Sequence, residues 1–271
     1  MPNWVQGKLE ITGKNAEKVM QSLLVDDNNE FSSFKFDFNK IKPMPKSLMV
    51  EVSTTSDKCA NYYLSSISDL ELAEITNKLL YINPKFIRGC DILSKEELEK
   101  IKKDYLASYS QKDPIFKDSP VFKTEKDIFN YGKQIVENVL KYGDKDWYNW
   151  SINNWGTKWN ACNTFYDKKV PNVVYFQTAW SDIRNLIETL STQHPQNTFR
   201  YDYAEEQMGY YCGYAVFKNG KVLESYAYTD YSKEAYEQSF ELWGEDESFV
   251  FDEKLGTYKY IDDQDDSGEE M

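Results

Sequence analysis

The sequence predicts an α+β fold in which an antiparallel sheet carries helices on one face. Three observations lead to this expectation. Segments of alternating apolar and polar residues occupy both ends of the chain, helix-period patterns fill the middle, and an Asn-Gly turn joins two strands in the C-terminal half. The chain has 271 residues, 41% of them hydrophobic, which is enough apolar material for a core.

The N-terminal part predicts the order strand, helix, strand. Residues 4–12 predict a strand, because apolar and polar residues alternate in its second half, with Leu9 and Ile11 on one face. Gly13 ends this strand. Residues 16–24 then place apolar side chains at helical spacing. Residues 25–33 are polar and turn-like, and residues 34–38, F-K-F-D-F, alternate as a second strand before the proline-rich exit I-K-P-M-P.

The middle of the chain has helical periodicity from about residue 58 to residue 142. We expect helices over residues 67–80, 94–106 and 125–142. Ser94 and Glu97 form a predicted capping box, and Gly143 is a typical residue after a helix end. We interpret residues 58–145 as a helical insertion.

The strand pattern returns after the insertion. Residues 173–177 predict a strand, residues 183–190 a helix capped by Ser181 or Asp182, and residues 198–203 and 208–217 two further strands. The turn K-N-G-K, residues 218–221, joins the last of these to a returning strand over 222–228, because Asn-Gly accepts the positive φ values of a type I′ turn. A helix over 232–242 and a weaker hairpin over 249–261 complete the pattern.

Without the insertion, the order is β-α-β-β-α-β with an appended hairpin, which is a split βαβ, or ferredoxin-like, arrangement. We therefore expect residues 1–57 to form the first half of this core and residues 146–261 the second half with extra strands. Residues 262–271 contain six acidic residues and no base, which is typical of a disordered tail.

The composition excludes several kinds of function. The net charge of −13 argues against general nucleic-acid binding, which needs a basic surface. The four cysteines have no C-x-x-C spacing, and the single histidine, His194, stands at a predicted helix end, so we expect no metal and no cofactor. No apolar run is long enough for a membrane helix and no signal peptide is recognisable, so we expect a cytoplasmic protein of a bacterial cell.

Residues 154–162, N-W-G-T-K-W-N-A-C, have two interpretations. Trp155 and Trp159 can flank a tight loop at Gly156 and close the core, since large aromatic residues are mostly buried. Alternatively they form an exposed recognition surface, because tryptophan with a polar surround is typical of binding hot spots. The candidate binding residues are Asn154, Trp155, Lys158, Trp159, Asn160 and Trp180, with Asp202 and Glu205 as nearby acids.

Several motifs resemble those of a known family. These are M-P-N-W, I-T-G, F-N-K-I-K-P-M-P, N-W-G-T-K-W-N-A and F-Q-T-A-W-S, found in blocks over residues 1–45 and 145–220. They are similar to the YubB-type family of plasmid- and phage-encoded proteins with a ferredoxin-like domain. The resemblance implies that fold and a mobile-element origin; it implies neither an activity nor an iron–sulfur cluster.

We expect a non-enzymatic, acidic protein-binding module of a phage or mobile element that acts on a host or viral protein. One form of this hypothesis is an inhibitor of a host defence nuclease, whose basic nucleic-acid groove would accept an acidic surface. The alternative is an enzyme or small-ligand binder with an aromatic pocket near Trp155, Trp159 and Trp180. A third hypothesis is that the protein binds single-stranded nucleic acid on an aromatic sheet face, with Lys168, Lys169 and Arg200 as the basic residues of that face.

Overall fold

The computed structural model describes residues 3–29, 32–86, 96, 100, 122 and 124–261. The predicted helix over 94–106, apart from residues 96 and 100, and the acidic tail over 262–271 lie outside these residues. The chain divides into two compact units, one made of Met1–Pro43 with Asn154–Met271 and the other of Met44–Asn153.

The first unit contains a six-stranded sheet in which all neighbouring strands are antiparallel. Its order is β4-β5-β1-β6-β7-β8. The strands are β1 (Trp4–Gly13), β4 (Cys162–Phe165), β5 (Val173–Ala179), β6 (Asn197–Glu205), β7 (Cys212–Lys218) and β8 (Lys221–Ala227). Strands β5 and β6 lie on either side of β1 and are joined by helix α7 (Arg184–Gln193), which is the predicted split βαβ connection.

The second strand of the core differs from the prediction. Residues 34–38 do not enter the main sheet, because β3 (Ser32–Phe36) pairs with β2 (Leu24–Asn29). Most of β2 lies in residues 25–33, which were predicted to be a turn. The chain then turns into the 3-10 helix η1 (Phe38–Lys40), whose cap is the Asp37 carboxylate accepting from the Asn39 amide. The edge of the main sheet is instead the short strand β4, and its Thr164 Oγ1 accepts from the Phe36 amide at 3.1 Å.

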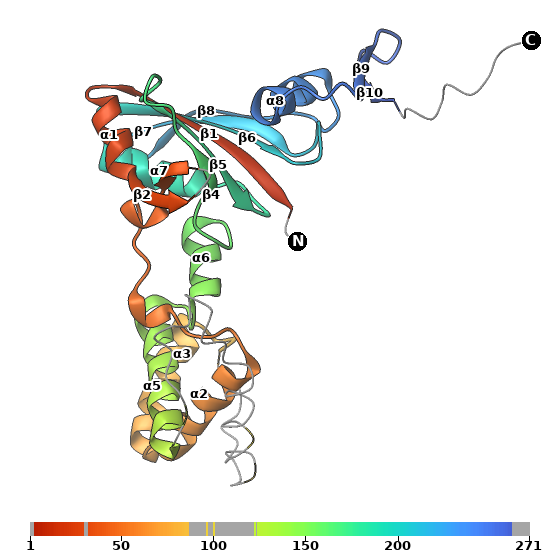
Figure 1. Cartoon of the computed structure of the whole chain (residues 1–271). Coiled ribbons are helices and arrows are strands. Elements are labelled where there is room, and N and C mark those ends of the chain that lie inside the picture. Colours follow the sequence, from red (N-terminus) through yellow and green to blue (C-terminus); the bar gives the residue numbers. More distant parts are fainter. Residues whose placement is uncertain are drawn as a thin grey trace, which may run out of the picture. The chain divides into compact units, whose positions relative to one another are not determined.

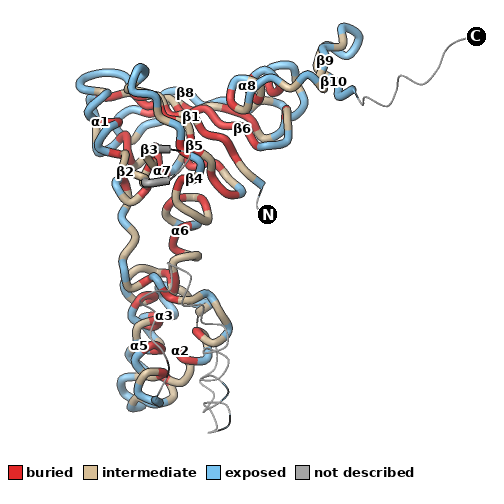
Figure 2. Tube along the Cα trace, viewed as in Figure 1, coloured by how far each residue is buried: buried red, intermediate tan, exposed pale blue. Residues whose placement is uncertain are grey.

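Helices α1 (Ala16–Leu23) and α7 lie on one face of the sheet and bury its aromatic core (Figures 1 and 2). Gly7 of β1 is needed in this core. A Cβ atom there would lie 2.9 Å from Tyr201 Cε2 and 3.0 Å from Phe176 Cζ. The two rings stack across this glycine with centroids 6.1 Å apart and planes at 11°.

Helix α8 (Lys233–Trp243) contacts the opposite face of the sheet. Trp243 Nε1 donates to the Ala204 carbonyl at 3.1 Å, and Lys8 Nζ lies 2.6 Å from Glu241 Oε1. Strands β9 (Phe249–Asp252) and β10 (Thr257–Tyr260) follow as an antiparallel pair, which confirms the predicted last hairpin.

The predicted K-N-G-K turn is also confirmed. Lys218 pairs with Lys221, and Asn219 and Gly220 have φ values of 49° and 69°, as the type I′ turn requires.

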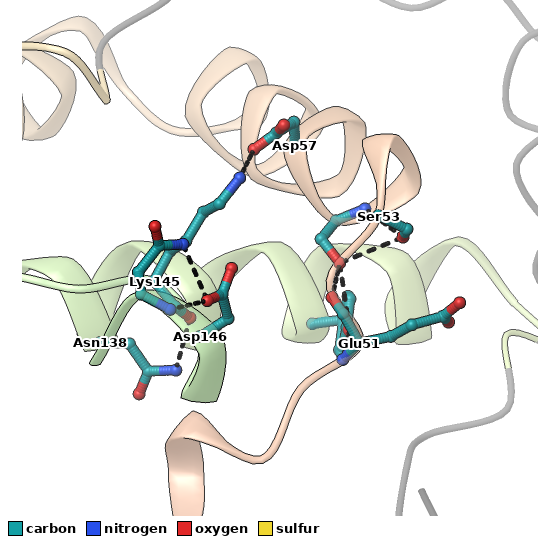
Figure 3. Close-up of polar contacts among 9 residues, drawn as sticks. Glu51, Ser53, Asp57, Asn138, Lys145 and Asp146 are labelled. Atoms are coloured by element: carbon teal, nitrogen blue, oxygen red, sulfur yellow. Dashed lines mark hydrogen bonds and ion pairs between the residues drawn. The ribbon is translucent and has the colours of Figure 1, made fainter. Parts of the chain in front are cut away.

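The second unit is a helical domain with its own core. Its described helices are η2 (Lys46–Leu48), α2 (Thr54–Ser66), α3 (Asp69–Ile82), α5 (Glu125–Tyr142) and the first part of α6 (Trp147–Trp155). The predicted helices over 67–80 and 125–142 correspond to α3 and α5, and Gly143 ends α5 with φ 81°. Lys145 reaches Asp57 of α2 with an Nζ–Oδ1 distance of 2.6 Å (Figure 3).

Helices α2 and α5 approach each other at Gly132, where a Cβ atom would lie 1.9 Å from the Cys59 carbonyl oxygen. The core between them contains Cys59, Tyr63, Ile128, Ile135 and Val139. No helix in the described part of the chain is long and apolar enough to cross a membrane.

Candidate functional site

Three of the predicted binding residues meet on one surface. Lys158 Nζ lies 4.4 Å from the ring centre of Trp159 and 4.9 Å from that of Trp180, which is within the range of cation–π attraction. Trp4 adjoins this group, with its ring centroid 6.1 Å from that of Trp159. We call Trp4, Lys158, Trp159 and Trp180 the tryptophan surface.

Trp180 has an unusual backbone conformation. It follows β5 directly, is 47% exposed, and has a φ of 72°, where bulky residues are strained. Its amide donates to the Asn3 carbonyl at 2.8 Å, which holds it beside the start of β1. The pairing of Trp4 with Ala179 brings Trp4 to the same end of the sheet.

The loop that carries Lys158 and Trp159 is fixed to the end of β5. Thr157 is buried, and its Oγ1 donates to the Ala179 carbonyl at 2.8 Å and accepts from the Ala179 amide at 3.1 Å. Ser181 Oγ donates to the Gly156 carbonyl at 2.5 Å, and Gly156 makes the turn with φ 85°. These bonds hold both loops in one arrangement, so the tryptophan surface is preorganised.

Two other predicted residues support the fold beneath this surface. Trp155 is buried, its Nε1 donates to the Lys42 carbonyl at 2.9 Å, and its ring packs edge-on against Phe38. Asn160 accepts from the Phe38 amide at 2.9 Å and donates to Asp37 Oδ1 at 2.7 Å, which anchors η1. Asn154 is half-buried in α6. Trp155 therefore belongs to the core, whereas Trp180 is exposed.

The two predicted acids lie in different places. Glu205 is buried at the end of β6, and its Oε1 accepts from Asn3 Nδ2 at 2.5 Å, so Asn3 connects it to the Trp180 backbone. Glu205 Oε2 is buried without a hydrogen-bond partner in the described part of the structure.

Asp202 points to the face opposite Tyr201 and Tyr203, because side chains alternate along β6. It accepts from Arg200 at 2.8 and 3.1 Å, and this hydrogen bond raises the pKa of Arg200. The Arg200 guanidinium lies 4.3 Å from the ring centre of Tyr214. Asp202 neutralises Arg200, so this part of the sheet offers little charge to a nucleic-acid phosphate.

A polar cluster of Asp182, Arg184 and Tyr211 was not predicted. The buried Asp182 carboxylate accepts from Arg184 Nε and Nη2 at 2.9 and 3.0 Å and from the Tyr211 hydroxyl at 2.6 Å. Burial and then the bond to Asp182 raise the pKa of Tyr211. Burial lowers the pKa of Arg184, but Asp182 outweighs this effect and raises it.

The Asp-x-Arg spacing after T-A-W-S was the available sequence signal for this cluster. Its charges are mutually satisfied, which suits a role in fixing the Trp180 loop better than acid–base chemistry. Among the residues that the structure describes, no three His, Cys, Asp or Glu side chains are placed to hold a metal ion.

The comparison with protein families concerns the part of the chain that contains three residues of this surface. Residues 154–246 match the family model described as the ferredoxin-like domain in Api92-like protein. The fold of this domain is ferredoxin-like. The match includes Lys158, Trp159, Trp180 and α8.

A solved structure, the protein api92 from Yersinia pseudotuberculosis, is similar over 84% of this chain and 99% of its own, with 14% sequence identity and a TM-score of 0.39. No curated protein sequence matches the chain. The resemblance to the YubB-type family remains a prediction.

Proposed function

We propose that this protein is a non-enzymatic binding module that recognises another protein through the tryptophan surface. The exposed and strained Trp180 carries this proposal, because its ring is held beside Lys158 and Trp159 by bonds that do not depend on a ligand. Preorganised tryptophans at the centre of a polar surround are typical anchors of protein interfaces.

The charge of the chain suggests what kind of partner this is. A net charge of −13 favours association with a basic protein surface and disfavours a nucleic acid. A host defence nuclease, or another protein with a basic nucleic-acid groove, has the required chemistry, and we propose inhibition of such a protein as the biological role.

The test begins with purification of the tagged protein from its bacterial host at low and high salt, followed by mass spectrometry and affinity measurement with the recovered partner. We expect one main partner whose binding weakens at high salt. Trp180→Ala should cost at least about 2 kcal/mol, roughly thirtyfold in affinity.

The matched control is Phe165→Ala, which removes an exposed aromatic ring from β4, since Phe165 is 62% exposed and Trp180 47%. It should bind like the wild type. Normal binding by folded Trp159→Ala and Trp180→Ala variants would remove the tryptophan surface from the proposal.

A further inference from the structure

Strand β8 is an open edge of the six-stranded sheet. All seven of its residues are exposed, and within the described part of the chain it pairs with β7 alone. The other edge, β4, is shorter and is contacted by β3 through the Phe36–Thr164 hydrogen bond. An exposed edge strand offers backbone donors and acceptors to an extended peptide.

The hydrogen-bond pattern shows which backbone groups of β8 point outward. The Tyr228 amide donates to the Cys212 carbonyl at 2.9 Å, so Cys212 and Tyr228 face each other as a hydrogen-bonded pair. Because such pairs alternate in an antiparallel ladder, Tyr226 and Glu224 also bond toward β7, whereas Ser225 and Ala227 direct their N–H and C=O groups away from the sheet. The pairing is regular from Glu224 to Ala227, because the bulge of β8 lies before this stretch, at Leu223.

A cavity of about 330 Å³ lies between this strand and α7. Ala215, Phe217 and Val222 form the apolar part of its lining, and Ser225 of β8 and Asn185 of α7 are uncharged polar residues that also line it. Glu188 of α7 also lines it, and no ion pair of its carboxylate is found among residues 124–261. The other charged side chains of the cavity, Asp182 and Arg184, neutralise each other.

The cavity and the tryptophan surface are formed in part by the same two loops. Gly156 and Asp182 line it, and they belong to the two loops that carry Lys158 and Trp180. The bond from Ser181 to the Gly156 carbonyl joins these loops. A partner anchored on Trp180 would therefore have the end of the cavity within reach.

We propose that an extended segment of the partner protein adds to β8 as a further strand and places an aliphatic side chain in the cavity between α7 and β8. This inference rests on the proposed function and names the way in which the partner binds. The outward groups of Ser225 and Ala227 require an extended backbone, the apolar walls select an aliphatic side chain, and Glu188 selects a neighbouring lysine or arginine.

The test uses a display library of random linear peptides selected on the full-length protein. We expect enrichment of peptides with an aliphatic residue close to a basic residue. Ser225→Pro removes the outward N–H without breaking the ladder to β7 and should lower peptide affinity at least about tenfold. The matched variant Ser225→Ala keeps the N–H and should bind normally, and Glu188→Gln should weaken selection of the basic residue.

Hydrogen exchange provides a readout that does not depend on the proline variant. Bound peptide should slow exchange of the Ser225 and Ala227 amides in the wild-type protein, because both become donors to the added strand. Failure to enrich any peptide, equal affinity for a folded Ser225→Pro protein, or unchanged exchange at both amides would overturn the proposal.

The partner protein separates this inference from the proposed function. Partner binding that is lost in Trp180→Ala but normal in Ser225→Pro would leave the proposed function standing and refute strand addition. Partner binding that ignores Trp180 and Trp159 would refute the proposed function itself.

Discussion

Trp180 combines a strained backbone with the exposed ring on which the proposed recognition depends. Its φ of 72° is a conformation that glycine adopts freely and that costs an L-residue roughly 1–2 kcal/mol. Its amide bond to Asn3 and the Thr157 and Ser181 contacts hold the loop in place despite this cost. The persistence of a large exposed ring at such a position is easier to explain by binding than by stability.

This strain leads to a comparison of two variants that both lack the ring. Trp180→Gly should be more stable than Trp180→Ala by about 1 kcal/mol, because only alanine retains the strained Cβ. Urea denaturation of the two proteins measures the difference, and both should lose partner binding. Equal stabilities would show that the backbone at this position relaxes when the ring is removed.

The cysteines have different accessibilities. Burial raises the pKa of Cys59 to about 12 and that of Cys212 to about 11, and both are fully enclosed. Cys162 is half-buried, and its pKa is also raised by burial. Because the thiolate is the reactive form, iodoacetamide at pH 8 should modify Cys162 before Cys59 and Cys212 in the native protein. Peptide mass spectrometry after a time course would show the order, and early labelling of Cys59 would contradict it.

Asp144, between α5 and α6, gives a prediction for pH dependence. Burial raises the pKa of its carboxyl, the hydrogen bond from Asn153 opposes this shift, and the nearby Asp146 adds to it. A carboxyl whose pKa is higher in the folded state binds its proton more tightly there, so its contribution to stability decreases as the pH rises from its unfolded pKa through its folded pKa.

Asp144→Asn should remove this contribution while keeping a polar partner for Asn153. The free energy of unfolding of the variant minus that of the wild type should therefore increase as the pH rises above the ordinary pKa of aspartate, about 4. Chemical denaturation across this range measures the trend. A difference that stays constant with pH would show that Asp144 titrates normally.

At the level of elements, predictions succeeded where local chemistry alone determines the structure. The Asn219-Gly220 turn and the end of α5 at Gly143 need only the φ values that these residues accept. Strand β4 could not be predicted, because C-N-T-F is short and its pairing with β5 depends on a distant segment. The F-K-F-D-F pattern predicted a strand over residues 34–38, of which residues 34–36 are in β3, and it could not show which sheet contains the strand.

The contact of α2 with α5 gives a stability prediction. Gly132→Ala would place a methyl group against the Cys59 backbone carbonyl, so the helices must separate. We expect a loss of about 3 kcal/mol, at the upper end of typical overpacking costs. Hydrogen exchange should show the loss in α2 and α5 and leave β1, β5 and β6 protected, because these strands belong to the other unit. The control is Gly143→Asn, which accepts the same positive φ and has no neighbour within 4 Å.

For the whole molecule, periodicity separated a helical middle from two strand-rich ends, and the structure places residues 44–153 in a unit of their own. The tryptophan surface could not be predicted from the sequence alone. Trp155 and Trp159 cannot be told apart from the sequence around them. Tertiary contacts distinguish them, because Trp155 packs against Phe38 in the core and Trp159 packs against Trp4 at the surface. Asp182 was predicted only as a helix cap, because its partner Tyr211 lies 29 positions away.

The arrangement of β1 in the sheet also has a consequence for synthesis of the protein. Val5 bonds to Thr178, which is 173 positions later in the chain, and the other neighbour of β1 is β6. Strand β1 leaves the ribosome before both of its neighbours and must wait for them, while the helical unit, encoded between β1 and β5, can fold earlier. During that interval β1 presents two unpaired edges and an apolar face, so the nascent chain is most vulnerable to aggregation, and most in need of a chaperone, before residue 205 has been translated.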